Sequence, residues 1–189
     1  MSRVAAKIKA WLGPKITTDS GALSAEMGAE AVAIGDGTAT SGSVDLTVKD
    51  NGKVAIAKGT ATASSGATGE DAYADTGTFG AADGADLLFV WNTKTSGESD
   101  DAALSGSTTR MLAIDLPFDF KSGPKVKEFY RESEASPQQL AELEIEGSTA
   151  VSTADSDATG DATNAEAYTD AFAGVGYSDI SAYANAIVG

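Results

Sequence analysis

Large side chains are scarce in this chain, and their scarcity limits what it can fold into. Hydrophobic residues make up 42% of the 189 residues, but aromatic residues make up only 7%, with 6 Phe, 5 Tyr and 2 Trp. Much of the other apolar content is alanine, so a core can form only where chain segments approach one another closely. We therefore expect a thin core layered between small-residue strands, and further burial through pairing with copies of the same chain.

Alternation with a period of two identifies the first strands. Residues Ser43–Val48 alternate polar and apolar side chains, and Asn51-Gly52 follows them. Asn-Gly between two alternating runs is a strong hairpin signal, because both residues tolerate positive φ. The sequence predicts that Val44–Val48 pairs with Val54–Ala57 across this turn.

The most hydrophobic strands are expected in the middle of the chain. Leu87–Thr93 and Arg110–Phe120 are predicted to form the centre of the core, joined by an exposed loop at Thr95–Gly106. Residues 59–84 are rich in Ala, Thr, Ser, Gly and Asp, which suits flat strands packed on another sheet, with disorder as the alternative. Together these patterns predict a mainly β fold, either a two-layer β-sandwich or a jelly-roll-like domain.

Composition divides the chain into three parts. We expect residues 1–16 to form a basic helical arm, residues 17–151 a β-rich core domain that begins with a polar linker at 17–30, and residues 152–189 an acidic C-terminal segment. Ser136-Pro137 is typical of a helix start, with the serine as N-cap and proline at the first helical position. The C-terminal segment is expected to end in a strand or a short helix.

The arm carries charge opposite to that of the body. Arg3, Lys7, Lys9 and Lys15 occur there without an acid, whereas the whole chain has 13 basic against 28 acidic residues. Such an arm is attracted to the acidic body of a neighbouring copy, although packing on its own body is the alternative. The residues proposed for assembly lie on one helical face or beside it: Val4, Lys7, Ile8, Lys9, Trp11 and Leu12.

Composition also argues against several classes of function. The chain has no His and no Cys, which removes imidazole acid–base chemistry, thiol nucleophiles and the usual zinc ligands. A net charge of −15 argues against nucleic acid as a partner, because phosphate binding needs clustered Lys and Arg. No apolar run is long enough for a transmembrane span. We therefore expect a protein that is not an enzyme.

One acidic segment has the spacing of a metal-binding loop. Oxygen-bearing side chains and a glycine follow the order Asp155-x-Asp157-x-Thr159-Gly160-Asp161-x-Thr163-x-x-Glu166. This segment resembles the calcium loop of EF-hand proteins over twelve residues. The resemblance implies calcium as the ion and the following metal ligands: Asp155, Asp157, Thr159, Asp161 through its carbonyl group, Thr163 and Glu166. A solvated acidic turn is the alternative.

The expected location is outside the cell or at its surface, without a cleaved signal peptide. Ala10–Pro14 is too short an apolar run for a signal-peptide core, and the apolar tail Ala182–Val188 resembles the uncleaved tails of type I secretion substrates. A buried terminal strand is the other interpretation of that tail. A virion is the alternative location.

These observations lead to one leading hypothesis of function. We expect a structural protein that assembles with copies of itself into an extracellular filament, surface lattice or particle shell, with calcium as a stabilising ion. A phage capsid-decoration or tail protein, with the capsid as partner, is the alternative within this class. A secreted carbohydrate-binding or adhesive module, which uses exposed Trp or Tyr and acts as a monomer, is the alternative from another class.

Overall fold

The computed structural model describes residues 22–116 and 125–189. Strands make up nearly all of these two ranges, and one short helix interrupts them. The elements are β1 (Leu23–Ile34), β2 (Gly37–Asp50), β3 (Ala55–Thr68), β4 (Tyr73–Asp83), β5 (Leu87–Glu98), β6 (Ala102–Asp115), β7 (Lys125–Glu134), α2 (Pro137–Ala141), β8 (Ser148–Thr159), β9 (Thr163–Gly174) and β10 (Tyr177–Val188).

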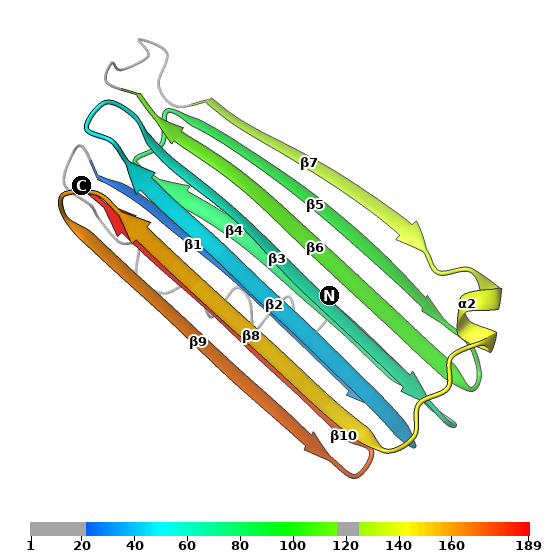
Figure 1. Cartoon of the computed structure of the whole chain (residues 1–189). Helices are drawn as coiled ribbons and strands as arrows, with labels where there is room; N and C mark the ends of the chain where they lie inside the picture. The colour runs from blue at the N-terminus through cyan, green and yellow to red at the C-terminus, as the bar shows by residue number, and fades with distance from the viewer. Residues whose placement is uncertain (1–21, 117–124) are drawn as a thin grey trace.

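The strands form two sheets that pack face to face (Figure 1). The six-stranded sheet has the order β7-β5-β6-β3-β2-β8, and the four-stranded sheet has the order β4-β1-β10-β9. All neighbouring pairs are antiparallel except β5 with β7 and β2 with β8. The predicted two-layer, mainly β sandwich is therefore confirmed.

The core between the sheets consists mostly of small residues. Leu23, Met27, Leu46, Met111 and Val188 are the larger members, and alanines from six of the strands fill the space around them. Every second residue of each inner strand points into this layer, as the pleat of a strand requires. The expectation of a thin core between small-residue strands is confirmed.

The prediction that the two most hydrophobic segments form the centre of the core is wrong in part. Val90 and Met111 point inward and are 4% and 2% exposed. Phe89, Trp91 and Leu112 lie on the opposite face of the same sheet, which points to solvent. Hydrophobicity predicted that these segments are strands, but it did not predict which of their faces is covered.

The predicted hairpin forms between β2 and β3, with a shifted register. Val44 lies opposite Ala61 and Val48 opposite Ala57, so the strands are longer and pair further from the turn than predicted. Gly52 has a φ of 77°, whereas the side chain of Asn51 accepts hydrogen bonds from the backbone N–H groups of Lys53 (3.0 Å) and Val54 (3.1 Å). This four-residue turn replaces the two-residue turn that Asn-Gly suggested.

Several segments that the sequence left open are strands. Residues 59–84 supply most of β3 and all of β4, and the expected loop at 95–106 is strand except around residues 99–101. The expected linker includes the start of β1 at Leu23. The C-terminal tail is β10, which alternates buried and half-buried residues between β1 and β9. The interpretation of the tail as a buried terminal strand is thus confirmed.

Strand β7 extends beyond the second layer. The nearest edge of the four-stranded sheet is β4, which packs mainly against β6 and β3 and only slightly against β5. All ten residues of β7 are exposed, although β7 pairs with β5 along its length. Figure 1 shows β5 and β7 on the side of the sheet away from β8 and β9. Among residues 22–116 and 125–189, no second layer therefore covers either face of this long strand.

The connection from β7 to β8 crosses the outer surface of the six-stranded sheet. It includes α2, whose predicted N-cap is confirmed: Ser136 and Gln139 form a capping box and Pro137 begins the helix. Leu140 of α2 is 8% exposed and lies over Gly97, and Ile145 lies over Gly66. Because neither glycine has a side chain, the connection can lie flat on the sheet. Among the described residues, no helix has the length and apolar character needed to span a membrane.

Candidate functional site

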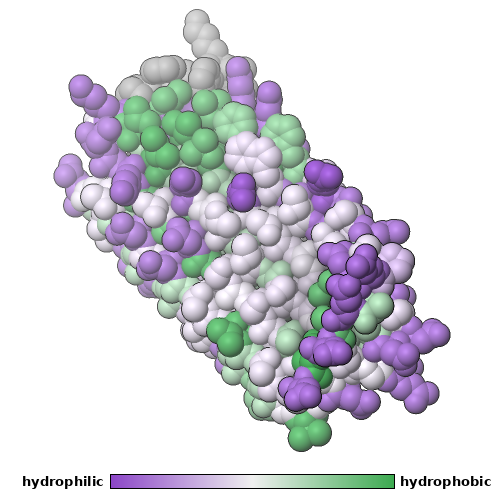
Figure 2. All heavy atoms as spheres, turned by 45° about the vertical axis from the view of Figure 1, so that its right-hand side comes forward, coloured by the Kyte–Doolittle hydropathy of each residue, from purple (hydrophilic) through white to green (hydrophobic). Residues whose placement is uncertain are grey.

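The two outer surfaces of the sandwich are the candidate functional surfaces. We call the outward face of the six-stranded sheet the front face and that of the four-stranded sheet the back face. Strand register assigns each side chain to one of them, because partners in neighbouring strands point to the same side. Figure 2 shows the front face, with apolar side chains gathered at one end, a neutral band across the middle, and a polar ridge near α2.

A patch of cations and aromatic rings covers one end of the front face. We define the basic aromatic patch as Phe89, Trp91, Arg110, Lys127, Phe129 and Arg131. Trp91 lies between Arg110 and Phe129 in register, and Phe89 lies beside Lys127. Trp91 is 39% exposed and Phe129 is 48% exposed, so both rings are open to a partner.

The rings of this patch stack on one another across the strands. The ring centroids of Phe89 and Trp91 are 5.9 Å apart, and those of Trp91 and Phe129 are 5.8 Å apart, with interplanar angles of 13° and 7°. Offset stacking at this separation is the favoured arrangement of aromatic pairs. The three rings therefore form one apolar strip that fixes the orientation of β7 against β5.

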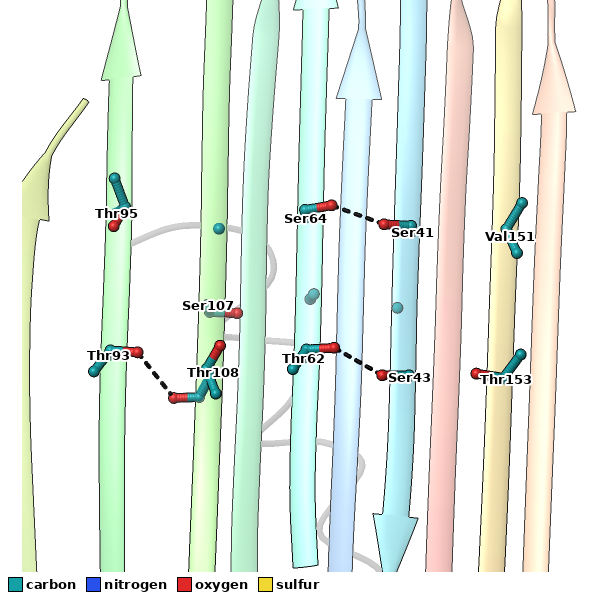
Figure 3. A pocket seen from close by; sticks show the side chains of 13 residues that line it. Ser41, Ser43, Thr62, Ser64, Thr93, Thr95, Ser107, Thr108, Val151 and Thr153 are labelled. Carbon is teal, nitrogen blue, oxygen red and sulfur yellow. Dashed lines mark hydrogen bonds between the residues drawn. The ribbon is translucent and has the colours of Figure 1, made fainter. Parts of the chain in front are cut away.

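Next to the patch lies a shallow, neutral band of hydroxyl groups (Figure 3). The Oγ atoms of Ser41 and Ser64 are 2.8 Å apart, and Ser43 Oγ lies 2.8 Å from Thr62 Oγ1. The hydroxyls thus bond to one another across β2 and β3 and leave a low surface between those strands. The residues that line this band are Ser41, Gly42, Ser43, Thr62, Ala63, Ser64, Thr93, Thr95, Gly106, Ser107, Thr108, Val151 and Thr153.

The back face has a different charge. Its four strands contain no Lys or Arg among their residues as given by the sequence and strand bounds. Phe79, Tyr183 and Tyr168 lie near one row across β4, β10 and β9, on either side of Gly28 in β1. Carboxylates lie at the outward positions of the neighbouring rows: Glu26, Glu30, Glu166, Asp170 and Asp179. The two outer faces of one sandwich are therefore electrostatically unlike.

Two tyrosines on the back face bond to these carboxylates. Tyr183 donates its hydroxyl to Glu26 Oε2 at 3.1 Å, and Tyr177 donates to Asp179 Oδ2 at 3.1 Å. Partial burial, followed by the nearby Glu26 carboxylate, raises the pKa of Tyr183 well above its usual 10.0. Burial and Asp179 likewise raise the pKa of Tyr177. Both phenols stay neutral donors that hold the back-face carboxylates in place.

The raised pKa of Tyr183 predicts a loss of stability at high pH. Above pH 10.0, the ordinary pKa, the unfolded state loses the phenolic proton while the folded state keeps it, so stability falls as pH rises toward the folded-state pKa. Urea unfolding at pH 9 to 12 should show this fall, and Tyr183→Phe should make it less steep. Tyr168→Phe, at a 53% exposed position of the same face, is the control and should leave the slope unchanged.

The residues of the predicted calcium loop do not form one ligand cluster. Asp155, Asp157 and Thr159 are alternate residues of β8 that point out of the front face, and Glu166 points out of the back face from β9. Strands replace the flanking helices of an EF-hand. Within residues 22–116 and 125–189, no group of three or more Asp or Glu side chains gathers as a metal site. Asp161 lies in the turn between the two strands, and Thr163 is the first residue of β9. Calcium binding here stays a prediction.

The residues predicted for assembly, Val4, Lys7, Ile8, Lys9, Trp11 and Leu12, lie outside the described residues. The sequence did not predict the basic aromatic patch, because Trp91 was assigned to the core and residues 125–134 were not predicted to be a strand. The signal that could have found it is the strict alternation of Lys125, Lys127, Phe129 and Arg131. That alternation has meaning only once residues 125–134 are known to form a strand.

Comparisons with known proteins found no similar protein. No protein-family model matches the chain, and neither a curated protein nor a solved structure matches it. The geometry of the two faces and of β7 therefore carries the functional argument.

Proposed function

We propose that this chain is a non-enzymatic structural protein that assembles with copies of itself into an extracellular filament, a surface lattice or a particle shell. The observation that carries the proposal is β7, a ten-residue strand with solvent on both faces. Ordering a residue costs about 1–2 kcal/mol of backbone entropy, and within the described part of the chain β7 offsets this cost mainly through pairing with β5 and the stacked rings. A neighbouring copy that covers β7 would supply the missing burial.

The charges of β7 favour a specific partner over general protection of a sheet edge. Natural sheets protect their edges with charged residues of either sign. In β7 the signs are separated: Lys127 and Arg131 point to the front, whereas Glu128, Glu132 and Glu134 point to the underside. A strand with two oppositely charged faces is suited to two different contacts.

The underside of β7 is the surface that best complements the N-terminal arm. Val126 and Tyr130 are 54% and 66% exposed there, and Val126 lies beside Leu88 at the margin of the core. The arm combines apolar residues with Arg3, Lys7, Lys9 and Lys15. We propose that the arm of one copy contributes to assembly on such acidic, partly apolar surfaces of another copy.

Light scattering coupled to size exclusion tests the proposal, with negative-stain images of early fractions. We expect regular particles or fibres whose size rises with concentration. Val126→Asp together with Tyr130→Asp should weaken association about tenfold or more, and so should deletion of residues 1–13. Val175→Asp, at a fully exposed turn position, is the control and should assemble as the parent does. Parallel runs in calcium and in chelator test the calcium prediction.

A result that contradicts the proposal is equally clear. A chain that stays monomeric up to about 100 μM, where even a Kd of 10 μM would produce dimers, is not a self-assembling protein. That outcome would favour a secreted carbohydrate-binding or adhesive module. The strip of Phe89, Trp91 and Phe129 on a flat face is the observation that supports this second candidate.

A further inference from the structure

We propose that copies of the chain stack front to back, with β7 of one copy lying on β9 of the next. The inference rests on the proposed self-assembly and names its contact surface. It is carried by the distribution of charge over the described residues, by a match of spacing between exposed side chains of two strands, and by the size of the two faces.

The distribution of cations is the first argument. The described Lys and Arg residues gather on the front face: Lys49, Lys58, Arg110, Lys125, Lys127 and Arg131. Of the others, Lys94 pairs with Asp75 and Lys53 lies in the turn between β2 and β3. The front face also carries Asp45, Asp155 and Asp157 on the side of β2 and β8, and Glu142, Glu144 and Glu146 in the connection that crosses one end of it. Outside that connection, the part of the front face formed by β5, β6 and β7 is basic in an otherwise acidic protein.

The spacing along two strands is the second argument. On β7 the outward residues Lys127, Phe129 and Arg131 give the order cation, ring, cation. On β9 the outward residues Glu166, Tyr168 and Asp170 give the order acid, ring, acid. In both strands the charges are four residues apart, which is about 13 Å along an extended strand.

This match works in either relative direction of the two strands. Because each triplet is symmetric about its ring, Phe129 can face Tyr168 with both cations opposite a carboxylate whether the strands run parallel or antiparallel. Phe129 and Tyr168 are 48% and 53% exposed, and the strands that carry them have no facing layer over these side chains. A contact between them would bury two rings and pair four charges.

The size of the faces is the third argument. A surface of four strands about 4.8 Å apart and twelve residues long covers roughly 760 Å². Specific interfaces bury about 800 Å² on each partner. The back face thus has the area of one standard interface. The hydroxyl band on the front face adds a low, neutral surface, and a stacked copy has to lie clear of the connection through α2 at one end of that face.

The symmetry of such a contact agrees with the proposed kinds of assembly. The front and the back are different surfaces, so the contact is head to tail. Each added copy presents a new basic front or a new acidic back. Such a contact continues into a filament or closes into a ring, whereas a two-fold dimer would stop after one pairing.

Charge reversal in two separate variants tests the inference. The front variant is Lys127→Glu with Arg131→Glu, and the back variant is Glu166→Lys with Asp170→Lys. Each variant alone should associate on the order of tenfold to a hundredfold more weakly, because like charges then face each other. An equimolar mixture should recover assembly, since the acidic front of one variant fits the basic back of the other.

Matched controls separate this contact from net charge and from misfolding. Lys49→Glu with Lys53→Glu changes charge by the same amount as the front variant, on the far side of the front face. Asp100→Lys with Asp101→Lys matches the back variant in an exposed turn. Both controls should assemble as the parent does. Urea unfolding midpoints of all four variants should stay near that of the parent, because every altered side chain is exposed.

The outcomes distinguish this inference from the proposed function. If the parent assembles and both single variants assemble equally well, front-to-back stacking is wrong, while self-assembly stands. If neither variant assembles alone and their mixture does not assemble either, the two faces do not contact each other, and the inference is again overturned. The mixing experiment is repeated with residues 1–13 deleted from both variants, so that the arm cannot supply the cations. Recovery of assembly in these shortened proteins supports the two faces as partners.

Discussion

Replacing Met27 by alanine is expected to lower the free energy of unfolding by about 3 kcal/mol. Met27 is fully buried between the sheets, and its Sδ atom lies over Gly59 of β3. Truncation would leave a cavity between β1 and β3, and an alanine-rich surrounding offers few long side chains to fill it. Urea unfolding of the purified variant gives the measurement.

The reciprocal change at Gly59 should be similarly severe. A Cβ atom at this position would overlap Met27 Sδ and would lie 2.8 Å from the carbonyl oxygen of Asp45 and 3.1 Å from Leu46 Cδ1. Since backbone cannot move as freely as a side chain, we expect Gly59→Ala to cost about 2 kcal/mol. Gly106→Ala is the matched control, because the nearest atom that a Cβ there would meet is the Ala63 carbonyl oxygen, at 3.9 Å.

A double-mutant cycle shows whether the two residues share one space. Met27→Ala removes the sulfur that the new methyl group at Gly59 would meet. The double variant should therefore be more stable than the sum of the single effects predicts, by about 1 kcal/mol. Additive effects, or a Gly59→Ala variant as stable as Gly106→Ala, would mean that the sheets separate easily and that close approach is not what stabilises the sandwich.

The sequence predicted the strands better than it predicted their surroundings. Alternation in Ser43–Val48 and the run Leu87–Thr93 marked true strands, because the pleat imposes a period of two whichever face is covered. The covered face depends on which sheet lies opposite, and that is a property of long-range pairing. Phe89 and Trp91 were therefore assigned to the core, although small residues such as Ala57 and Ala184 occupy it.

The acidic segment illustrates the same limit for site residues. Asp155, Asp157 and Thr159 have the spacing of calcium ligands, but every second residue of a strand also points to one side. The two patterns coincide over residues 155–159, and in the structure these residues are part of strand β8. Pairing of β8 with β2 and of β9 with β10 then places Asp155 and Glu166 on opposite faces of the sandwich. A local spacing could not predict that separation.

The strand formed by the charged segment 125–134 was not predicted, for a different reason. Without an apolar alternation the segment gave no strand signal. In β7 the neighbouring residues Phe129 and Tyr130 point to opposite faces, and both are exposed. Pairing with β5, whose residues Trp91 and Asn92 are their partners, is what orders this strand.

The ion pair that joins the projecting part of the six-stranded sheet to β4 should be the most sensitive polar contact. Lys94 Nζ lies 2.8 Å from Asp75 Oδ1, and the two side chains are 26% and 9% exposed. Asp75 also accepts a hydrogen bond from the backbone N–H of Thr76 at 2.9 Å. Lys94→Met would leave a buried carboxylate without its cation, which we expect to cost about 2 kcal/mol.

A double variant without either charge distinguishes two effects on the free energy of unfolding: the stabilisation by the ion pair, and the cost of a buried carboxylate that has lost its cation. Asp75→Asn with Lys94→Met keeps the volume and leaves no buried charge, so this double variant should be at least about 1 kcal/mol more stable than Lys94→Met alone. Lys53→Met, in the exposed turn after β2, is the control for loss of a cation and should stay within about 0.5 kcal/mol of the parent. If Lys94→Met unfolds at the same urea concentration as Lys53→Met, the ion pair does not hold β5 to β4. The packing of Leu88 and Val90 alone must then keep the six-stranded sheet in place beyond the edge of its partner.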